Sequence, residues 1–323
     1  MHRRNWIIAT AIAALGSLAA SAFAQSYPTK AVRIVVPYAT GGGSDVLARQ
    51  IGAVLPQSWG QGVAVENKAG ASGNIGTMEV VRAAADGYTL LLQNSTMVTN
   101  LGLNDKLPYD PEKDLTPIML LGITPIALVA HPSAGINDVK DLIAASKAKP
   151  GALSYGSCGT GTPQHFVMEL VKQKTGVSAV NVGYKGCAPA LTDVLGGQIP
   201  LAIVSANLVA PHVKTGKLKV IGVSSSQRYG LLPDSPTFEE QGLKPFDFSI
   251  WYALMGPAKL PAEVVNRVST DVGKILADPA IQAKLTAAGV ESYKGNAQDL
   301  ARLIKTDAAR YTQLAKSANI KAE

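Results

Sequence analysis

Two glycine-rich turns are the features of this sequence whose residue types and spacing could do chemistry. The first lies in PYATGGGSDVLAR (37–49), between an apolar run and a helical pattern, and the second lies in CGTGTPQH (158–165). A turn from a strand into a helix points free backbone N–H groups and the positive end of the helix dipole at one place. The pattern therefore predicts a site for an anion.

The spacing of the first turn argues against a nucleotide. A dinucleotide-binding G-x-G-x-x-G motif that used Gly41 and Gly43 would need a third glycine where Val46 stands. A phosphate-binding P-loop needs a lysine directly after its glycines, and here Asp45 would repel a phosphate instead. A small carboxylate is the better candidate, and no cofactor is predicted.

Both turns run into predicted helix caps. Ser44 is a candidate N-cap after the first turn, and Thr162 is one after the second, with Pro163 well suited to the first helical position. Two helix starts that face each other across a cleft could share one carboxylate through their amides. Such a site requires no buried arginine, and neither turn contains one.

Several of these residues also have purely structural explanations, which the sequence leaves open. The three glycines 41–43 could form a tight turn without a ligand. Asp45 could complement the helix dipole, and His165 is of a type that more often forms structural hydrogen bonds than catalyses. Ser95 and Ser205 end two predicted strands and could be ordinary turn residues.

The first residues predict a targeting segment. Arg3 and Arg4, an apolar run and Ala22-Phe23-Ala24 are typical of a secretory signal peptide over residues 1–24, cleaved after Ala24. An uncleaved membrane anchor is the alternative. No later run reaches the ~18 apolar residues of a membrane helix. We therefore expect export to the periplasm.

Charge and cysteine content narrow the possible partners. The net charge of +7 is scattered without a basic cluster, so no nucleic-acid partner is predicted. Cys158 and Cys187 could pair in an oxidising compartment or remain two buried thiols. His165 and Glu169 share a helix face, but two ligands are too few for a zinc site, and no metal is predicted.

Apolar runs alternate with helical patterns along the chain, which predicts an α/β fold with largely parallel sheets. Each half holds a strand, a glycine turn and a helix, and later a strand that ends in Ser or Asn. The apolar stretches 123–132 and 245–258 are predicted to cross between two lobes. The expected architecture is a clamshell that binds ligand at the carboxyl ends of its strands and closes about a hinge.

The chain resembles the Bug family, the extracytoplasmic solute receptors linked to tripartite tricarboxylate transporters. The resemblance spans essentially everything after residue 24 and is carried by PYATGGGSDVLAR, ENKAGASGNIG, LSYGSCGTGTPQH, VGYKGCAPALTDVLGGQIPL and DFSIWYALMGPA. It implies a two-lobed periplasmic binding protein of type II, with two crossing strands and an organic acid between the lobes. The domain boundaries implied are 25–123 with 249–323 for domain 1, and 124–248 for domain 2.

The same resemblance implies particular ligand contacts. The family's two glycine turns hold the ligand's proximal carboxylate, and its polar strand ends and an aromatic residue complete the pocket. Ala39-Thr40 stand where members often have prolines, and a Cys158–Cys187 disulfide would tie the second turn to the YKG turn. Carried onto this chain, the contacts are Tyr38, Gly43, Ser44, Asp45, Ser95, Gly161, Thr162, His165 and Ser205.

The predicted function is binding without catalysis. A monomeric receptor would pass a dicarboxylate, tricarboxylate or aromatic acid to transporter subunits, or alternatively present it to a membrane sensor kinase. A secreted hydrolase built on Ser157, His165 and Asp193 is the remote alternative. Its nucleophile elbow would need a glycine where Tyr155 stands.

Overall fold

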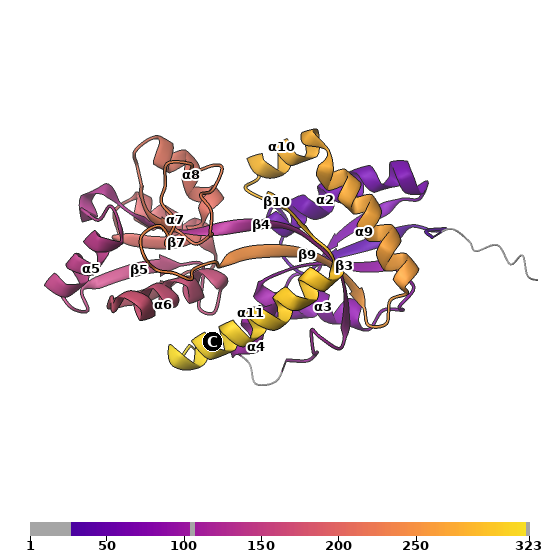
Figure 1. Cartoon of the computed structure of the whole chain (residues 1–323), viewed down its shortest axis with the longest axis horizontal. Coiled ribbons are helices and arrows are strands. Elements are labelled where there is room, and N and C mark those ends of the chain that lie inside the picture. The colour runs from indigo at the N-terminus through magenta and orange to yellow at the C-terminus, as the bar shows by residue number, and fades with distance from the viewer. Residues whose placement is uncertain (1–26, 104–106, 321–323) are drawn as a thin grey trace, which may run out of the picture.

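The structure is a computed structural model that describes residues 27–103 and 107–320. The predicted signal peptide, residues 1–24, lies outside the described residues. Two lobes lie side by side and are joined by two long strands, β4 (Leu115–Ala130) and β9 (Ser249–Pro257) (Figure 1). The predicted α/β fold of two lobes with two crossing strands is therefore confirmed.

The first lobe is built on three parallel strands in the order β2-β1-β3. Next in the sheet, β9 pairs antiparallel with β3, and β4 pairs antiparallel with β9. Apolar side chains of β1 and β3 are fully buried beneath the helices. Its strands are β1 (Val32–Val36), β2 (Val63–Asn67), β3 (Thr89–Asn94) and β10 (Glu291–Gly295). Its helices are α2 (Gly43–Trp59), α3 (Asn74–Val81), α4 (Thr96–Leu103), α9 (Ala262–Ala277), α10 (Pro279–Ala287) and α11 (Ala297–Ser317).

The second lobe repeats this arrangement. Its three parallel strands have the order β6-β5-β7, the same as β2-β1-β3. The second half of β4 pairs antiparallel with both β7 and β8. Its strands are β5 (Leu153–Ser157), β6 (Ala179–Gly183), β7 (Leu201–Ser205) and β8 (Lys219–Val223). Its helices are α5 (Val139–Ala148), α6 (Pro163–Thr175), α7 (Cys187–Leu195) and α8 (Ala206–Lys214).

The first crossing strand is longer than the sequence predicted. β4 begins at Leu115 rather than at residue 123, because its first half pairs with β9 and its second half with β7 and β8. Prolines made the first half resemble a connection. Pro117 lacks an N–H that could donate to the neighbouring strand. It is tolerated because the pairing of β4 with β9 shifts register between Pro117 and Met119, and such a bulge needs no hydrogen bond from the proline.

Three short elements escaped the sequence analysis: α4, α8 and β10. The helices α4 and α8 follow β3 and β7 directly, where only polar turns were predicted. Their helical pattern is weak because α8 contains Pro211 and α4 contains Gly102. A side chain at Gly102 would lie 2.8 Å from the Tyr311 carbonyl oxygen, so this glycine allows α4 to approach α11 closely.

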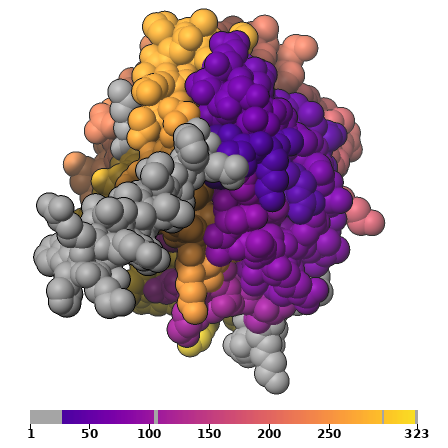
Figure 2. All heavy atoms as spheres, turned by 90° about the vertical axis from the view of Figure 1, so that its right-hand side faces the viewer, coloured from indigo at the N-terminus to yellow at the C-terminus, as the bar shows by residue number. Residues whose placement is uncertain are grey.

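Segments far apart in sequence pack together, both within the first lobe and between the two lobes. Figure 2 shows α9 and α10 beside the N-terminal part of the chain, and the Trp59 indole of α2 donates to Asp271 of α9 at 2.9 Å. The last helix, α11, contacts both α4 and α6. Its Tyr311 ring meets Phe166 of the second lobe edge-on, with 5.0 Å between ring centroids. The C-terminal helix therefore packs against both lobes.

Candidate ligand-binding cleft

A cavity of about 670 Å³ lies between the two lobes. Strand ends and helix starts form one wall from each lobe, and two side chains of β9 complete it. The lining residues are Tyr38, Ala39, Thr40, Gly42, Gly43, Ser44, Asn94, Thr96, Thr162, Pro163, Gln164, Lys185, Gly186, Cys187, Ala188, Pro189, Ile250 and Tyr252.

The cavity has a positive electrostatic character. The first turns of α2, α4, α6 and α7 all contribute lining residues, so the positive ends of four helix dipoles point toward it. None of the described residues in this lining is acidic, and Lys185 adds one formal positive charge. The cavity is therefore suited to an anion.

In the first turn, the Asp45 side chain accepts hydrogen bonds that hold the turn in its conformation. Gly41, at φ +86°, donates its amide to the Asp45 carboxylate at 2.9 Å, and Arg49 and Asn67 donate to the same group at 3.0 and 2.9 Å. Burial of Asp45 opposes its ionisation, but the hydrogen bonds from Arg49, the Gly41 amide and Asn67 outweigh burial and hold its pKa below the usual value. The carboxylate stabilises the turn and does not line the cavity.

The predicted cap of the first helix is wrong by two residues. The N-cap is Gly42, and Ser44 occupies the second helical position. The Ser44 hydroxyl accepts from the Asn94 amide at 3.3 Å instead of from the helix backbone. Because Gly42 has no side chain to occupy them, the first-turn amides of α2 remain directed at the cavity.

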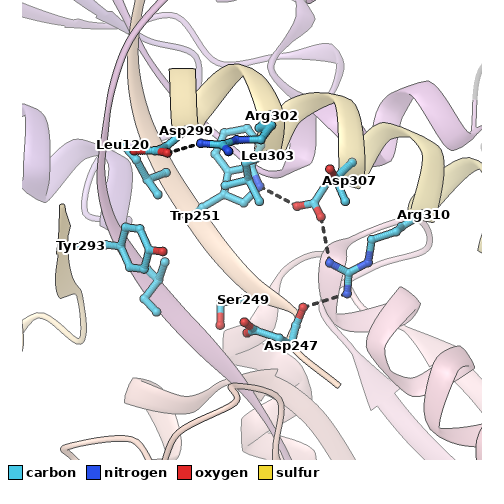
Figure 3. A pocket seen from close by; sticks show the side chains of 12 residues that line it. Leu120, Asp247, Ser249, Trp251, Tyr293, Asp299, Arg302, Leu303, Asp307 and Arg310 are labelled. Atoms are coloured by element: carbon cyan, nitrogen blue, oxygen red, sulfur yellow. Dashed lines mark hydrogen bonds and ion pairs between the residues drawn. The ribbon is translucent and has the colours of Figure 1, made fainter. Parts of the chain in front are cut away.

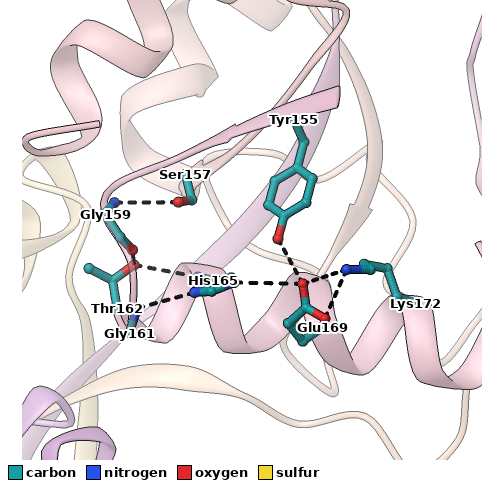
Figure 4. A network of polar contacts seen from close by, with 8 residues as sticks. All are labelled: Tyr155, Ser157, Gly159, Gly161, Thr162, His165, Glu169 and Lys172. Atoms are coloured by element: carbon teal, nitrogen blue, oxygen red, sulfur yellow. Dashed lines mark hydrogen bonds and ion pairs between the residues drawn. The ribbon is translucent and has the colours of Figure 1, made fainter. Parts of the chain in front are cut away.

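In the second turn, the cap prediction is confirmed. Thr162 is the N-cap of α6, Pro163 follows at the first position, and the Thr162 hydroxyl accepts from the His165 amide at 3.4 Å. The same hydroxyl donates to the Gly159 carbonyl at 2.8 Å (Figure 4). Gly161, at φ +74°, donates its amide to Nδ1 of His165 at 3.1 Å. Nδ1 is thus the acceptor, and Nε2 faces the other way.

His165 continues into a buried polar network (Figure 4). Its Nε2 lies 3.6 Å from the Glu169 carboxylate, which also accepts from the Tyr155 hydroxyl at 3.0 Å and the Lys172 ammonium at 2.7 Å. Burial raises the pKa of Glu169, but hydrogen bonds from His165 and Lys172 outweigh it and leave the pKa below the usual value. The network anchors the imidazole away from the cavity.

The structure sorts the predicted contacts into two groups. Tyr38, Gly43, Ser44 and Thr162 line the cavity. The other five do not line the cavity: two accept backbone N–H groups, one is a glycine whose amide is such a donor, and two are serines at strand ends. This second group is Asp45, His165, Gly161, Ser95 and Ser205.

The two strand-end serines behave differently. Ser205 accepts a hydrogen bond from the Gln164 side chain at 3.2 Å, just as Ser44 accepts one from Asn94 in the first lobe. The Ser95 hydroxyl is fully buried and has no hydrogen-bond partner among the residues that the structure describes. Each lobe therefore ties its helix start to the neighbouring strand end, with the roles of the two positions exchanged.

Sequence reasoning missed the wall formed by residues 185–189 and the contribution of Tyr252. The YKG turn leads into α7, whose glycine N-cap, Gly186 at φ +105°, was a readable signal. Tyr252 and Ile250 alternate with Trp251 along β9, and the period of two separates a cleft face from a core face. A side chain at Gly43 would collide with the Tyr252 ring, so only glycine fits there.

The two cysteines form a disulfide in this structure. Cys158 begins the turn after β5, and Cys187 begins α7 and lines the cavity. The Gly186 amide donates to the Cys158 carbonyl at 3.1 Å, which adds a backbone tie at the same place. The free-thiol alternative is thereby set aside, and the second glycine turn is joined covalently to the opposite wall segment of its lobe.

A second hollow, of about 440 Å³, lies on the opposite face of β9 (Figure 3). Trp251 lies at its base, and its indole donates to Asp307 at 2.9 Å. Here both arginines of the lining are paired, Arg310 with Asp307 at 3.1 Å and Arg302 with Asp299 at 2.6 Å. Asp247 also lines the hollow, and its carboxylate forms no ion pair with the residues that the structure describes. Burial raises the pKa of Asp307. The lining of this hollow thus has three aspartates and two arginines, whereas the described lining of the cleft has no acidic side chain.

The residues proposed for a hydrolase do not assemble. Ser157 accepts from the Gly159 amide at 3.4 Å, His165 is bound to Gly161, and Asp193 accepts from the Tyr184 hydroxyl. Within residues 27–103 and 107–320, no group of three His, Cys, Asp or Glu side chains could hold a metal ion.

The fold and cleft are those of a two-lobed periplasmic solute-binding receptor. Solved structures of this class align over most of the chain: a protein of R. palustris with adipate is 33% identical, with TM-score 0.80, covering 91% of this chain and 99% of that one. MatC from Rhodopseudomonas palustris with bound malate is 28% identical, with TM-score 0.76, covering 89% and 99%.

The family follows from the sequence comparison. Residues 47–320 match the TctC model, described as the tripartite tricarboxylate transporter family receptor, and the chain belongs to this family. BugT of Bordetella pertussis is 34% identical over 291 residues, which are 90% of this chain and 89% of that protein. The resemblance to the Bug family is confirmed, and the chain is a receptor rather than an enzyme. No helix in the described residues is long and apolar enough to span a membrane.

Proposed function

We propose that this protein captures a small organic carboxylate between its lobes and delivers it to the membrane subunits of a tripartite tricarboxylate transporter. The lining of the cleft carries the proposal, because helix starts from both lobes point into a space whose described lining has no acidic side chain. The adipate and malate in two related structures support the ligand class. The description of the family supports the recipient.

The two glycine turns contribute unequally to the proposed headgroup site. Pro163 has no N–H, the His165 amide donates to the Thr162 hydroxyl, and that hydroxyl donates its own hydrogen to the Gly159 carbonyl. The start of α6 therefore offers chiefly the Gln164 amide. The start of α2 offers the amides of Gly43 and Ser44. The first turn thus supplies most of the donors, and the second turn closes over them.

We propose that ligand binding is coupled to transport by closure of the two lobes about their hinge. Ligand that contacts both lobes favours the closed form and shifts the population toward it. The lobes we propose as moving units are 25–123 with 249–323, and 124–248, since the crossings fall at their junctions. We further propose export with cleavage after Ala24 and action as a periplasmic monomer.

A thermal-shift screen of C4–C6 dicarboxylates, citrate and aromatic acids tests the function. A ligand at one hundred times its Kd adds about 2.7 kcal/mol to the free energy of unfolding, which is readily seen as a higher Tm. A screen in which no organic acid raises the Tm would contradict the proposal.

Thr162→Ala separates ligand contact from helix capping. We expect it to raise the Kd of the best acid about fivefold, which corresponds to about 1 kcal/mol. Asp138→Ala is the matched control, because Asp138 caps α5 away from the cleft by accepting from Asp141 at 2.8 Å. That control should lose stability and keep its Kd. Equal Kd values in both variants would remove Thr162 from the site.

A further inference from the structure

Lys185 is the one formally charged side chain among the described residues that line the cleft. It is exposed and forms no ion pair with any acidic side chain that the structure describes, whereas Lys113 and Lys172 each bind a neighbouring carboxylate. A lone cation on the wall of an acid-free cavity raises the local concentration of anions and favours anionic groups in contact with it.

The backbone of Lys185 is held firmly on both sides. Before it, the Tyr184 amide donates to the Ser157 carbonyl at 3.1 Å, and the Tyr184 hydroxyl donates to Asp193. After it, the Gly186 amide donates to the Cys158 carbonyl at 3.1 Å, and Cys187 is joined to Cys158 by the disulfide. The backbone at Lys185 is thus already ordered before a ligand binds. Binding then costs the conformational entropy of the side chain but little entropy of the backbone.

The position of Lys185 places its charge on a different wall from the proposed headgroup donors. Those donors are the backbone amides at the start of α2 and the Gln164 amide of α6, and they provide for one carboxylate without any charged side chain. The cavity, at about 670 Å³, is much larger than one carboxylate and leaves room for a ligand with a second polar end. An ammonium at that end is complementary to a second acidic group.

We propose that Lys185 is the specificity-determining residue of the cleft and selects ligands with a second acidic group, which its ammonium binds as a charge-assisted hydrogen bond. This inference rests on the proposed function. Because the YKG turn is fixed by the disulfide, the inference also gives that bond a role: it keeps the selecting cation at the cavity wall.

Matched acid pairs test the selection by isothermal titration calorimetry. The probes are succinate with butyrate, glutarate with pentanoate, and adipate with hexanoate, so each pair differs only in the second carboxylate. In the wild type we expect the best dicarboxylate to bind about tenfold more tightly than its partner. Lys185→Met should remove this preference, and Lys185→Arg should retain it.

Lys217→Met, at an exposed lysine outside the cleft lining, is the control and should leave every Kd unchanged. The inference is overturned if the wild type binds both members of each pair equally, or if Lys185→Met keeps the preference for the dicarboxylate. Failure of every acid, in this panel and in the wider screen, would instead overturn the proposed function itself. Thermal unfolding of each variant verifies that the fold is intact.

Discussion

The two glycine turns reach the same geometry through different chemistry. Each has a glycine of positive φ just before the N-cap, and in each the third helical residue accepts that glycine's amide: Asp45 for Gly41, and His165 for Gly161. The acceptor is a carboxylate in the first lobe and an imidazole nitrogen in the second. The shape of the turn is therefore what the two lobes share.

The two turns differ in the interactions that stabilise them and in the number of backbone amides that they leave free for a ligand. The first has a glycine cap and open amides, and its stability depends on the ion pair of Asp45 with Arg49. The second has a threonine cap, a proline in place of one amide, and a disulfide. We interpret the first turn as the source of most hydrogen-bond donors to the ligand. We interpret the second turn as the more rigid wall, which contacts the ligand from the other side of the cleft.

The disulfide should produce the largest effect. Cys158→Ala with Cys187→Ala releases a bridge between residues 29 apart in sequence, and the chain-entropy model predicts a loss of about 3.5 kcal/mol in the free energy of unfolding. Urea unfolding of the oxidised wild type against the double variant measures it. Adding a reductant to the wild type should reproduce most of the loss and leave the variant unchanged. A loss below about 1 kcal/mol would show that the second turn does not depend on its covalent tie.

Asp45→Ala should come next. It removes the acceptor of the Gly41 amide, Arg49 and Asn67 at a buried position, and we expect a loss of about 3 kcal/mol. Because the pKa of Asp45 is lowered by folding, its contribution is complete above the unfolded value near ~4 and fades as the pH falls through the folded value. The difference between variant and wild type should therefore shrink in acid.

Asp299→Ala is the matched control for Asp45→Ala. Asp299 is also the third residue of a helix and accepts from the Asn296 amide at 3.1 Å, but its side chain is 42% exposed. We expect a clearly smaller loss there, since solvent replaces the missing partner. Equal losses at the two sites would mean that burial of Asp45 adds nothing to the first turn.

Much of this architecture was readable because its signals are local. The cap at Thr162 with Pro163, the glycine turns and the long apolar crossings each depend on residues adjacent in sequence. The hydrogen bonds from the Gly41 amide to Asp45 and from the Gly161 amide to His165 were harder to predict, although donor and acceptor are four residues apart in both turns. The resemblance to the Bug family predicted Asp45 and His165 as ligand contacts, and their shared role as acceptors of a glycine amide appears only when the two turns are compared in the structure.

The rest of the cleft depends on information that a single sequence lacks. Tyr252 lies on the cleft face of β9 and Trp251 on the other, but alternation alone does not say which face meets the ligand. The wall at Lys185 is brought to the cavity by the disulfide and the second sheet. Gly102 in α4 allows the close approach of α11, whose contacting residue Tyr311 lies more than 200 residues away in the sequence.

Paired glycine substitutions should give the smallest effect on stability and the clearest difference between the turns. Gly41→Ala and Gly161→Ala each force a methyl group into the left-handed region, at a cost of about 1–2 kcal/mol. Nothing lies within 4 Å of the methyl at Gly41, whereas the methyl at Gly161 would press on Leu103 of the first lobe. Only Gly161→Ala should therefore hinder closure and raise the Kd of the best acid.

The Leu103→Ala change decides whether that loss of affinity comes from contact between the lobes. In a double-mutant cycle, Leu103→Ala should restore affinity to Gly161→Ala and leave Gly41→Ala as it was, because the first glycine has no neighbour across the cleft. Calorimetry supplies the four Kd values and urea unfolding the matching stabilities. If Gly41→Ala weakens binding as much as Gly161→Ala does, the second turn is not the wall that meets the opposite lobe, and the division of labour between the turns is wrong.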